Sequence, residues 1–110
     1  MQTTAIGTRA EKYVALHLRK RGYKLLALNW QTPVCEVDIV AFKADCVYFV
    51  EVRYRSSQEQ GGGFSTVTRR KLHHMQRAAE IWVRHQQWLG EYTIVVAEVS
   101  GSGVIKLAEI

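Results

Sequence analysis

The sequence has a single proline, Pro33, and only two cysteines, Cys35 and Cys46. One proline in 110 residues, together with 47% hydrophobic residues, excludes a proline-rich or disordered chain. Two cysteines without a C-x-x-C spacing exclude a disulfide scaffold and are typical of buried, reduced thiols. The length supports one hydrophobic core and not two, so we expect a single domain over residues 1–110.

Long hydrophobic runs are also absent. No apolar stretch approaches the roughly 20 residues that a membrane-spanning helix needs. The first residues, MQTTAIGTRAEK, lack the basic segment and the apolar segment that make up a signal peptide. We therefore expect a cytoplasmic protein without a membrane partner.

The net charge is +5, but acidic and basic residues are unevenly distributed along the chain. Residues 1–30 hold six basic residues and one acid, and residues 52–90 hold seven basic residues and two acids. Between them, residues 31–51 hold four acids and one lysine. An acidic island between basic segments suits a polyanion held over a metal site, although a solvated basic surface explains the net charge equally well.

The hydrophobic pattern predicts seven elements in the order α-β-β-β-α-β-β. A flexible loop is expected over 56–65, where three glycines follow one another. Ala44 and Asp45 are expected to turn the second strand back into the third. The predicted helices are 5–21 and 66–87, and the predicted strands are 24–30, 35–42, 47–55, 92–100 and 104–108.

Each predicted helix has an apolar stripe. Gly22, after a run of cations, is expected to end the first helix. Core packing is the default explanation for both stripes. Their residues are Ala10, Tyr13, Val14, Leu16 and Leu18 in the first helix, and Leu72, Met75, Ala79 and Trp82 in the second.

Acids interrupt two of the apolar strands. In the strand VYFVEVRYR, alternation places Phe49, Glu51, Arg53 and Arg55 on one side. Thirteen residues before Glu51, the strand CEVDIVAF carries Glu36 and Asp38, again on one side. A carboxylate in a buried strand is costly without compensation, so these acids indicate a site.

If the two strands pair, Glu36, Asp38 and Glu51 converge. Two unit charges 4 Å apart repel by roughly 4 kcal/mol at an effective dielectric constant of 20. A divalent cation removes this repulsion, and carboxylate oxygens favour Mg²⁺ or Mn²⁺. Arg53 could then face a phosphoryl oxygen. A purely structural ion pair of Arg53 with Glu51 or Asp38 explains the spacing equally well.

An ordered set of motifs resembles the YraN family of uncharacterised bacterial proteins over most of the chain. An acid on one strand followed by E-x-K or E-V-R on the next is also similar to the PD-(D/E)xK nucleases, the restriction-endonuclease-like superfamily. The matching segments are Gly7 and Glu11, Gly22-Tyr23, Asn29, Glu36–Val40 against G-E-I-D-L-I, Phe49–Arg55 against F-V-E-V-[KR]-x-R, and Thr66–Thr68 with Lys71, Ala78-Ala79 and Trp82.

This resemblance implies an α/β, restriction-endonuclease-like fold, with a central mixed β-sheet flanked by helices. It also implies metal-dependent hydrolysis of phosphodiesters, with Asp38 and Glu51 as ligands of Mg²⁺ or Mn²⁺. Glu11 is a further candidate ligand if it faces inward; an exposed glutamate is the alternative. The similarity to Holliday-junction resolvases suggests branched DNA as the substrate.

Three positions depart from the family pattern. Arg53 stands where the superfamily has lysine, and an arginine stays protonated, so it cannot act as a general base. Cys35 replaces the usual glycine before the first acid. Tyr92-Thr93-Ile94 stands where members commonly have Arg-x-Asp.

The leading hypothesis is therefore a DNA nuclease with Asp38, Glu51 and Arg53 as catalytic residues. Glu36 and Glu11 are expected to assist at the metal. The basic residues expected to bind the nucleic-acid backbone are Arg55, Arg69, Arg70 and Lys71. The alternatives are a weakly active or inactive module that binds nucleic acid or a protein partner, and an assembly role. The oligomeric state is left open, with a homodimer as one expectation.

Other motifs carry weaker functional signals. His73 and His74 have no further ligands at metal spacing, so exposed histidines are expected. The glycine run 61–63 lacks the Lys-Ser/Thr of a phosphate-binding loop. The three tryptophans, Trp30, Trp82 and Trp88, could stack on bases, but packing is the stronger explanation.

Overall fold

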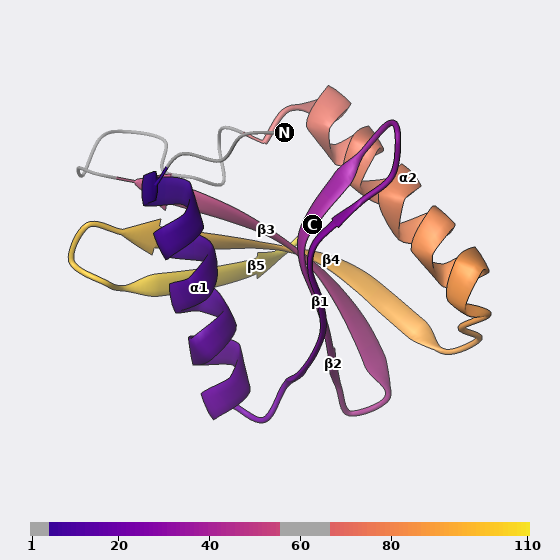
Figure 1. Ribbon diagram of the computed structural model, residues 1–110, viewed down its shortest axis with the longest axis horizontal. Helices are drawn as coiled ribbons and strands as arrows, with labels where there is room; N and C mark the ends of the chain where they lie inside the picture. The colour runs from indigo at the N-terminus through magenta and orange to yellow at the C-terminus, as the bar shows by residue number, and fades with distance from the viewer. Residues whose placement is uncertain (1–4, 56–66) are drawn as a thin grey trace.

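A five-stranded mixed sheet with one helix on each face forms the fold (Figure 1). The computed structural model describes residues 5–55 and 67–110, so the predicted loop 56–65 lies outside the described residues. The element order and the α/β class agree with the sequence-based prediction and are compatible with a restriction-endonuclease-like architecture. The elements are α1 (Ala5–Lys20), β1 (Lys24–Gln31), β2 (Glu36–Lys43), β3 (Cys46–Arg55), α2 (Arg69–Gln86), β4 (Glu91–Ser100) and β5 (Ile105–Glu109).

The strands lie in chain order, β1-β2-β3-β4-β5. All neighbours are antiparallel except β3 and β4, which are parallel. Parallel neighbours need a crossover, and the chain between them supplies α2. β2 and β3 form the predicted hairpin, with Ala44 and Asp45 at φ 51° and 64° in its turn. Both positive values suit a two-residue turn that matches the twist of the strands.

Local capping sets the helix ends. Gly22, at φ 91°, follows α1, and Tyr23 N–H donates to the Leu18 carbonyl at 3.0 Å. This is the glycine stop predicted from the sequence. α2 starts at Arg69 rather than near Thr66, because the Thr68 hydroxyl caps it by accepting the Lys71 N–H at 3.1 Å.

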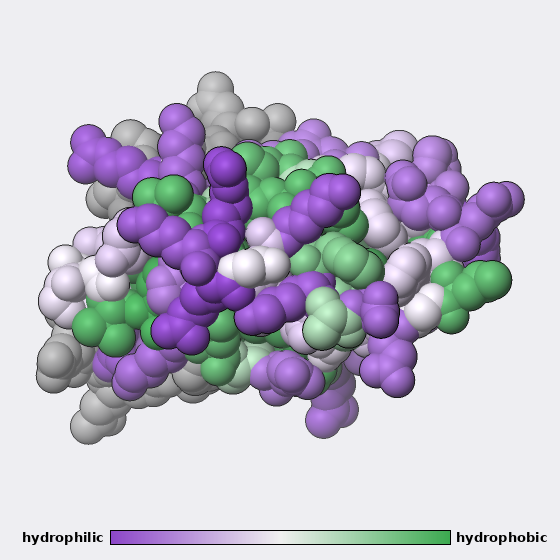
Figure 2. Space-filling view, turned by 90° about the horizontal axis from the view of Figure 1, so that it is seen from below, coloured by the Kyte–Doolittle hydropathy of each residue, from purple (hydrophilic) through white to green (hydrophobic). Residues whose placement is uncertain are grey.

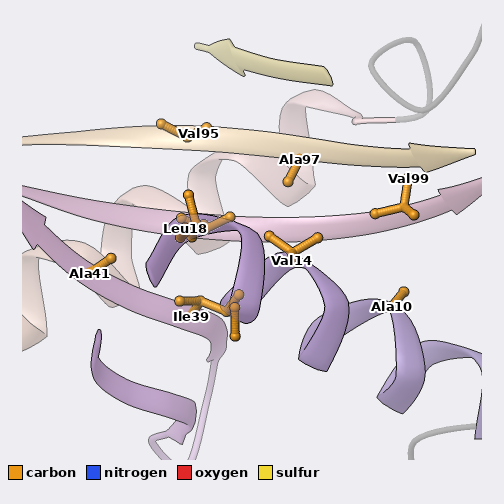
Figure 3. Packing of buried hydrophobic residues seen from close by; sticks show 10 residues of the cluster. Ala10, Val14, Leu18, Ile39, Ala41, Val95, Ala97 and Val99 are labelled. Carbon is orange, nitrogen blue, oxygen red and sulfur yellow. The ribbon is translucent and has the colours of Figure 1, made fainter. Parts of the chain in front are cut away.

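Helix α1 packs on one face of the sheet. Figure 3 shows Val14 and Leu18 of this helix over the face of the sheet, and they share one buried cluster with Ile39 and Val95. Tyr13 and Leu16, which the predicted stripe includes, are instead 46% and 50% exposed. The Tyr13 hydroxyl donates to the Gly103 carbonyl at 2.8 Å, which keeps that ring at the margin of the core.

Helix α2 covers the opposite face. Its buried residues are Met75, Ala78, Ala79 and Trp82, and Leu72 is only half-buried, so Ala78 rather than Leu72 completes the stripe. They pack with Val40, Val47, Phe49 and Ile94 of the sheet. Phe49 contacts Trp82 edge-to-face at a centroid distance of 5.6 Å. Alternation along β3 therefore puts Glu51 and Arg53 on the α2 face, beyond this apolar cluster.

One face of the molecule shows a mixed surface. On the face seen in Figure 2, hydrophilic side chains cover most of the area and hydrophobic ones show between them. Within residues 5–55 and 67–110, no helix is long and apolar enough to cross a membrane.

Candidate metal centre and its charged surroundings

Asp38 lies where β2 and β3 separate. The paired residues of these strands run from Lys43 and Cys46 to Ile39 and Val50, although both strands continue beyond that pair. Past it, the Asp38 Oδ2 atom accepts a hydrogen bond from the Val52 backbone N–H at 2.8 Å. The carboxylate thus supplies an acceptor to a β3 amide near the point where the ladder ends. Its position is fixed by the backbone of the neighbouring strand.

Glu51 is buried beside Asp38, with 7% of its surface exposed. Burial raises the pKa of the Glu51 carboxyl, and the charge of Asp38 raises that pKa further. Two cations oppose the shift. Lys71 Nζ and Arg53 Nε each lie 3.4 Å from the Glu51 Oε2 atom. Glu51 therefore interacts with the acid on β2 and with cations from β3 and α2.

Asp38 has the same balance of forces. Burial raises the pKa of the Asp38 carboxyl above its usual value. The Val52 N–H and the charges of Lys71 and Arg53 lower that pKa, but less than burial raises it. A buried carboxyl with a raised pKa among specific charge partners is typical of a functional site, although structural ion-pair networks also produce such shifts.

Glu11 and Glu36 belong to the same electrostatic neighbourhood. Both residues are half-buried, so Glu11 is neither fully inward nor fully exposed. Burial raises the pKa of each carboxyl, and the charge of Asp38 is the second cause in both. A side-chain hydrogen bond with Asn29 lowers the pKa of Glu11. Glu11 reaches this neighbourhood from α1 and Glu36 from β2.

Asn29 lies at the register position facing Asp38, between the pairs Leu28–Ile39 and Trp30–Val37. Its φ of 51° is a left-handed conformation, which asparagine adopts more readily than most residues. Sequence reasoning identifies Asn29 only as a motif position. Its hydrogen bond to Glu11 depends on how α1 lies over β1, which local sequence does not encode.

The donor chemistry fits a divalent cation in part. Asp38 and Glu51 offer carboxylate oxygens from adjacent strands, and Mg²⁺ commonly binds one or two carboxylates while keeping several waters. Among residues 5–55 and 67–110, however, no three His, Cys, Asp or Glu side chains are grouped as a complete protein metal site would require. The fit is therefore to a two-carboxylate site, with Glu36 and Glu11 as half-buried acids that also sense the charge of Asp38.

The predicted nucleic-acid-binding residues separate into two groups. Arg69 and Arg70 are exposed in the first turn of α2, where no acid accompanies them. Lys71 turns inward to Glu51. Arg55 Nη1 lies 4.0 Å from the Glu98 Oε2 atom. The structure thus brings Lys71 to the carboxylates and leaves Arg69 and Arg70 at the surface.

Sequence reasoning missed Glu98. This residue is 5% exposed and stands opposite Arg53 in the β3–β4 register. A signal was present in the sequence, because Glu98 interrupts the apolar run of β4 as Glu51 interrupts that of β3. The weaker candidates behave as expected: His73 and His74 are exposed, Trp82 is buried, and Trp30 and Trp88 are half-buried. The glycine run 61–63 lies outside the described residues.

Comparisons with known proteins give one consistent family. The family model described as "Uncharacterised protein family UPF0102" matches residues 10–99. A UPF0102 protein of Alkaliphilus metalliredigens is 31% identical over 96 residues, covering 86% of this chain and 84% of the relative. One of Pseudomonas entomophila is 39% identical over 80 residues, covering 73% of this chain and 65% of the relative.

A UPF0102 protein of Renibacterium salmoninarum is 34% identical over 80 residues, covering 73% of this chain and 68% of the relative. UPF0102 and YraN designate the same family, so the resemblance inferred from the motifs is confirmed. On the match over residues 10–99 and on these relatives, the chain belongs to the UPF0102 family.

Proposed function

We propose that this protein is a metal-dependent nuclease that hydrolyses phosphodiester bonds of DNA, with branched DNA as its preferred substrate. The observation that carries the proposal is the pairing of Asp38 and Glu51. These two acids come from adjacent strands, Glu51 is buried and Asp38 is half-buried, and the charge of Asp38 raises the pKa of Glu51. Such an arrangement is unfavourable without a cation, and lysine and arginine side chains already approach it.

In this proposal the acidic residues bind the metal ion. Asp38 and Glu51 hold Mg²⁺ or Mn²⁺, and Glu36 and Glu11 add negative charge around the site. When bound, the cation neutralises charge on the phosphate and lowers the pKa of a coordinated water. In the reaction, the oxygen of a water molecule bonds to phosphorus and that water loses a proton to the solvent. The bond to the leaving sugar oxygen breaks, and that oxygen takes a proton from the solvent.

Arg53 and Lys71 stabilise the negative charge that builds on the phosphoryl oxygens. Neither needs to change its charge for this role. Arg53 stays protonated, so the proton of the attacking water must leave by another route. Arg69 and Arg70 are exposed at the start of α2, where they can bind phosphates of the flanking strand. The homodimer remains an expectation.

A second candidate is a nuclease-like module that binds nucleic acid without cleaving it. One observation favours it: Lys71 and Arg53 both lie 3.4 Å from the same Glu51 oxygen. These two ion pairs offset the negative charge of Glu51 without a metal. Arg53 in place of the superfamily's lysine points the same way.

Cleavage by the wild type and by Asp38→Asn separates the two candidates. Purified proteins are incubated with linear, flap and four-way DNA, in Mg²⁺ and in Mn²⁺. The nuclease proposal expects slow cleavage by the wild type, faster with Mn²⁺, and none by the variant. Unchanged DNA binding by the variant shows that it is folded. Equal residual cleavage by both proteins indicates contamination and favours the binding module.

A further inference from the structure

Glu98 is a buried acid for which the proposed chemistry has no role. It lies in β4 with 5% of its surface exposed, within the buried run 94–99 of that strand. Alternation places it with Ile94 on the α2 face, the face that also carries Glu51 and Arg53. Burying a carboxylate is costly unless charge and hydrogen bonds compensate it. The charged side chains near Glu98 therefore determine what role it can have.

The nearest cationic side chain, Arg55, does not form a hydrogen bond with Glu98. Arg55 Nη1 is 4.0 Å from the Oε2 atom, beyond hydrogen-bond distance. Among residues 5–55 and 67–110, that buried oxygen has no hydrogen-bond partner. Arg53 Nε, buried in the same region, also lacks one within those residues. An acceptor and a donor thus remain unused on the same face of the sheet.

Arg53 has one carboxylate beside it on its own strand and another at its register position on the neighbouring strand. Its own strand supplies Glu51, whose Oε2 atom is 3.4 Å from the Arg53 Nε atom. The neighbouring strand supplies Glu98, which is the register partner of Arg53 in the parallel pair of β3 and β4. An arginine has five N–H donors in a planar fork, so a modest rotation of the side chain can exchange one carboxylate for the other.

We propose that Glu98 is a positioning residue that holds Arg53 away from Glu51 when a divalent cation binds. This inference rests on the proposed function. A cation at Asp38 and Glu51 repels the Arg53 guanidinium, and Glu98 provides a buried acceptor for it. The exchange frees the Glu51 oxygen for the cation and keeps Arg53 beside the phosphate. Without Glu98, Arg53 stays on Glu51 and competes with the cation.

The experiment measures Mn²⁺ binding to the full chain without DNA, by calorimetry or by the electron paramagnetic resonance of free Mn²⁺. Four proteins are compared: wild type, Glu98→Gln, Arg53→Gln and the double variant. Glu98→Gln is expected to weaken binding by roughly twofold to a hundredfold, the range of coupling between contacting groups. Arg53→Gln is expected to bind at least as tightly as wild type. In the double variant, the Glu98 change is expected to have no further effect.

Glu91→Gln is the matched control, because it removes the same charge from an exposed residue of β4. An effect of Glu98→Gln no larger than this control overturns the inference. So does an effect that persists undiminished in the Arg53→Gln background, since Glu98 would then act through another group, such as Arg55. If Glu98→Gln fails to fold, Glu98→Asp, which withdraws the carboxylate by one methylene, takes its place with the same expectations.

The same titration separates the two proposals. Wild type that binds no more Mn²⁺ than Asp38→Asn contradicts the metal site, and with it both the proposed function and the role of Glu98. Wild type that binds Mn²⁺ through Asp38, with Glu98→Gln equal to Glu91→Gln, contradicts the role of Glu98 alone.

Discussion

The Asp38 carboxylate accepts a hydrogen bond from the Val52 backbone N–H at 2.8 Å, across the point where β2 and β3 part. Glu51, in contrast, has the side chains of Lys71 and Arg53 as its partners. Asp38 is therefore the rigid member of the pair, and Glu51 is the member whose partners can exchange. An asparagine at position 38 keeps an acceptor for Val52 and loses only the charge.

Asp38→Asn is expected to raise the free energy of unfolding of the metal-free protein at neutral pH. Burial raises the pKa of Asp38, so the folded state holds this proton to higher pH than the unfolded state does. Stability is then lost as pH rises from about the usual value of 3.8 through the raised folded pKa. The gain in the free energy of unfolding should therefore be present above the folded pKa of Asp38 and vanish below about pH 3.8.

Denaturant unfolding in a chelating buffer, from pH 3 to pH 8, tests this expectation. Asp45→Asn, in the exposed turn between β2 and β3, removes the same charge and is the control. A gain for Asp38→Asn that is equal at both ends of the pH range contradicts the explanation.

Arg53→Lys is expected to retain or raise any cleavage activity. The resemblance to the superfamily places a lysine at this position, and a lysine can lose its proton when desolvated, whereas an arginine cannot. The measurement is kcat/KM on four-way DNA in Mn²⁺, and the cleavage seen with Asp38→Asn is subtracted as contaminating activity. Arg55→Lys makes the same change two residues along the strand. If kcat/KM falls more in Arg53→Lys than in Arg55→Lys, the site does not accept a lysine at position 53.

DNA binding is expected to weaken steeply with salt, because the basic segments act through phosphates. Arg69→Glu with Arg70→Glu should weaken binding to all sequences alike and make the salt slope shallower by roughly 0.9 for each phosphate that is no longer neutralised. Fluorescence anisotropy with labelled four-way DNA measures both quantities. The control is Arg77→Glu with Arg84→Glu, which changes the net charge equally on exposed positions of the same helix. Binding that does not vary with salt points instead to a protein partner.

Thr68→Ala is expected to destabilise the protein by about 1 kcal/mol, the usual effect of removing a helix cap. The Thr68 hydroxyl accepts the N–H of Lys71, so its loss also loosens the turn that places this lysine on Glu51. Chemical denaturation measures the effect, and Thr68→Ser retains the hydroxyl as a control. Equal stability of the alanine and serine variants would show that the Thr68 cap does not contribute to the free energy of unfolding.

Features set by local sequence could be predicted. Alternation along β3 was enough to place Glu51 and Arg53 together, and Ala44-Asp45 was enough to predict the hairpin. Gly22 marked the end of α1 because a left-handed stop favours glycine. These features depend on residues close in the chain, where periodicity and turn chemistry apply.

Features set by the packing of distant elements could not be predicted. The hydrogen bond from Val52 to Asp38 depends on where two strands part, and the ion pair of Lys71 with Glu51 depends on where the crossover places α2. Glu98 interrupts the apolar run of its strand, but its place opposite Arg53 depends on the pairing of β3 with β4. The exposure of Leu16 depends on how α1 lies on the sheet, which periodicity alone does not fix.

The parallel pairing of β3 and β4 has a consequence for the order of folding. Asp38 and Glu51 sit on one hairpin, so short-range contacts can bring their strands together early. Glu98 stands beside Arg53 only after the chain has closed the long crossover through α2, which is slower because more chain entropy must be lost first. Lys71 also arrives with that crossover. We therefore expect the acidic pair to assemble before its stabilising cation from α2 reaches it.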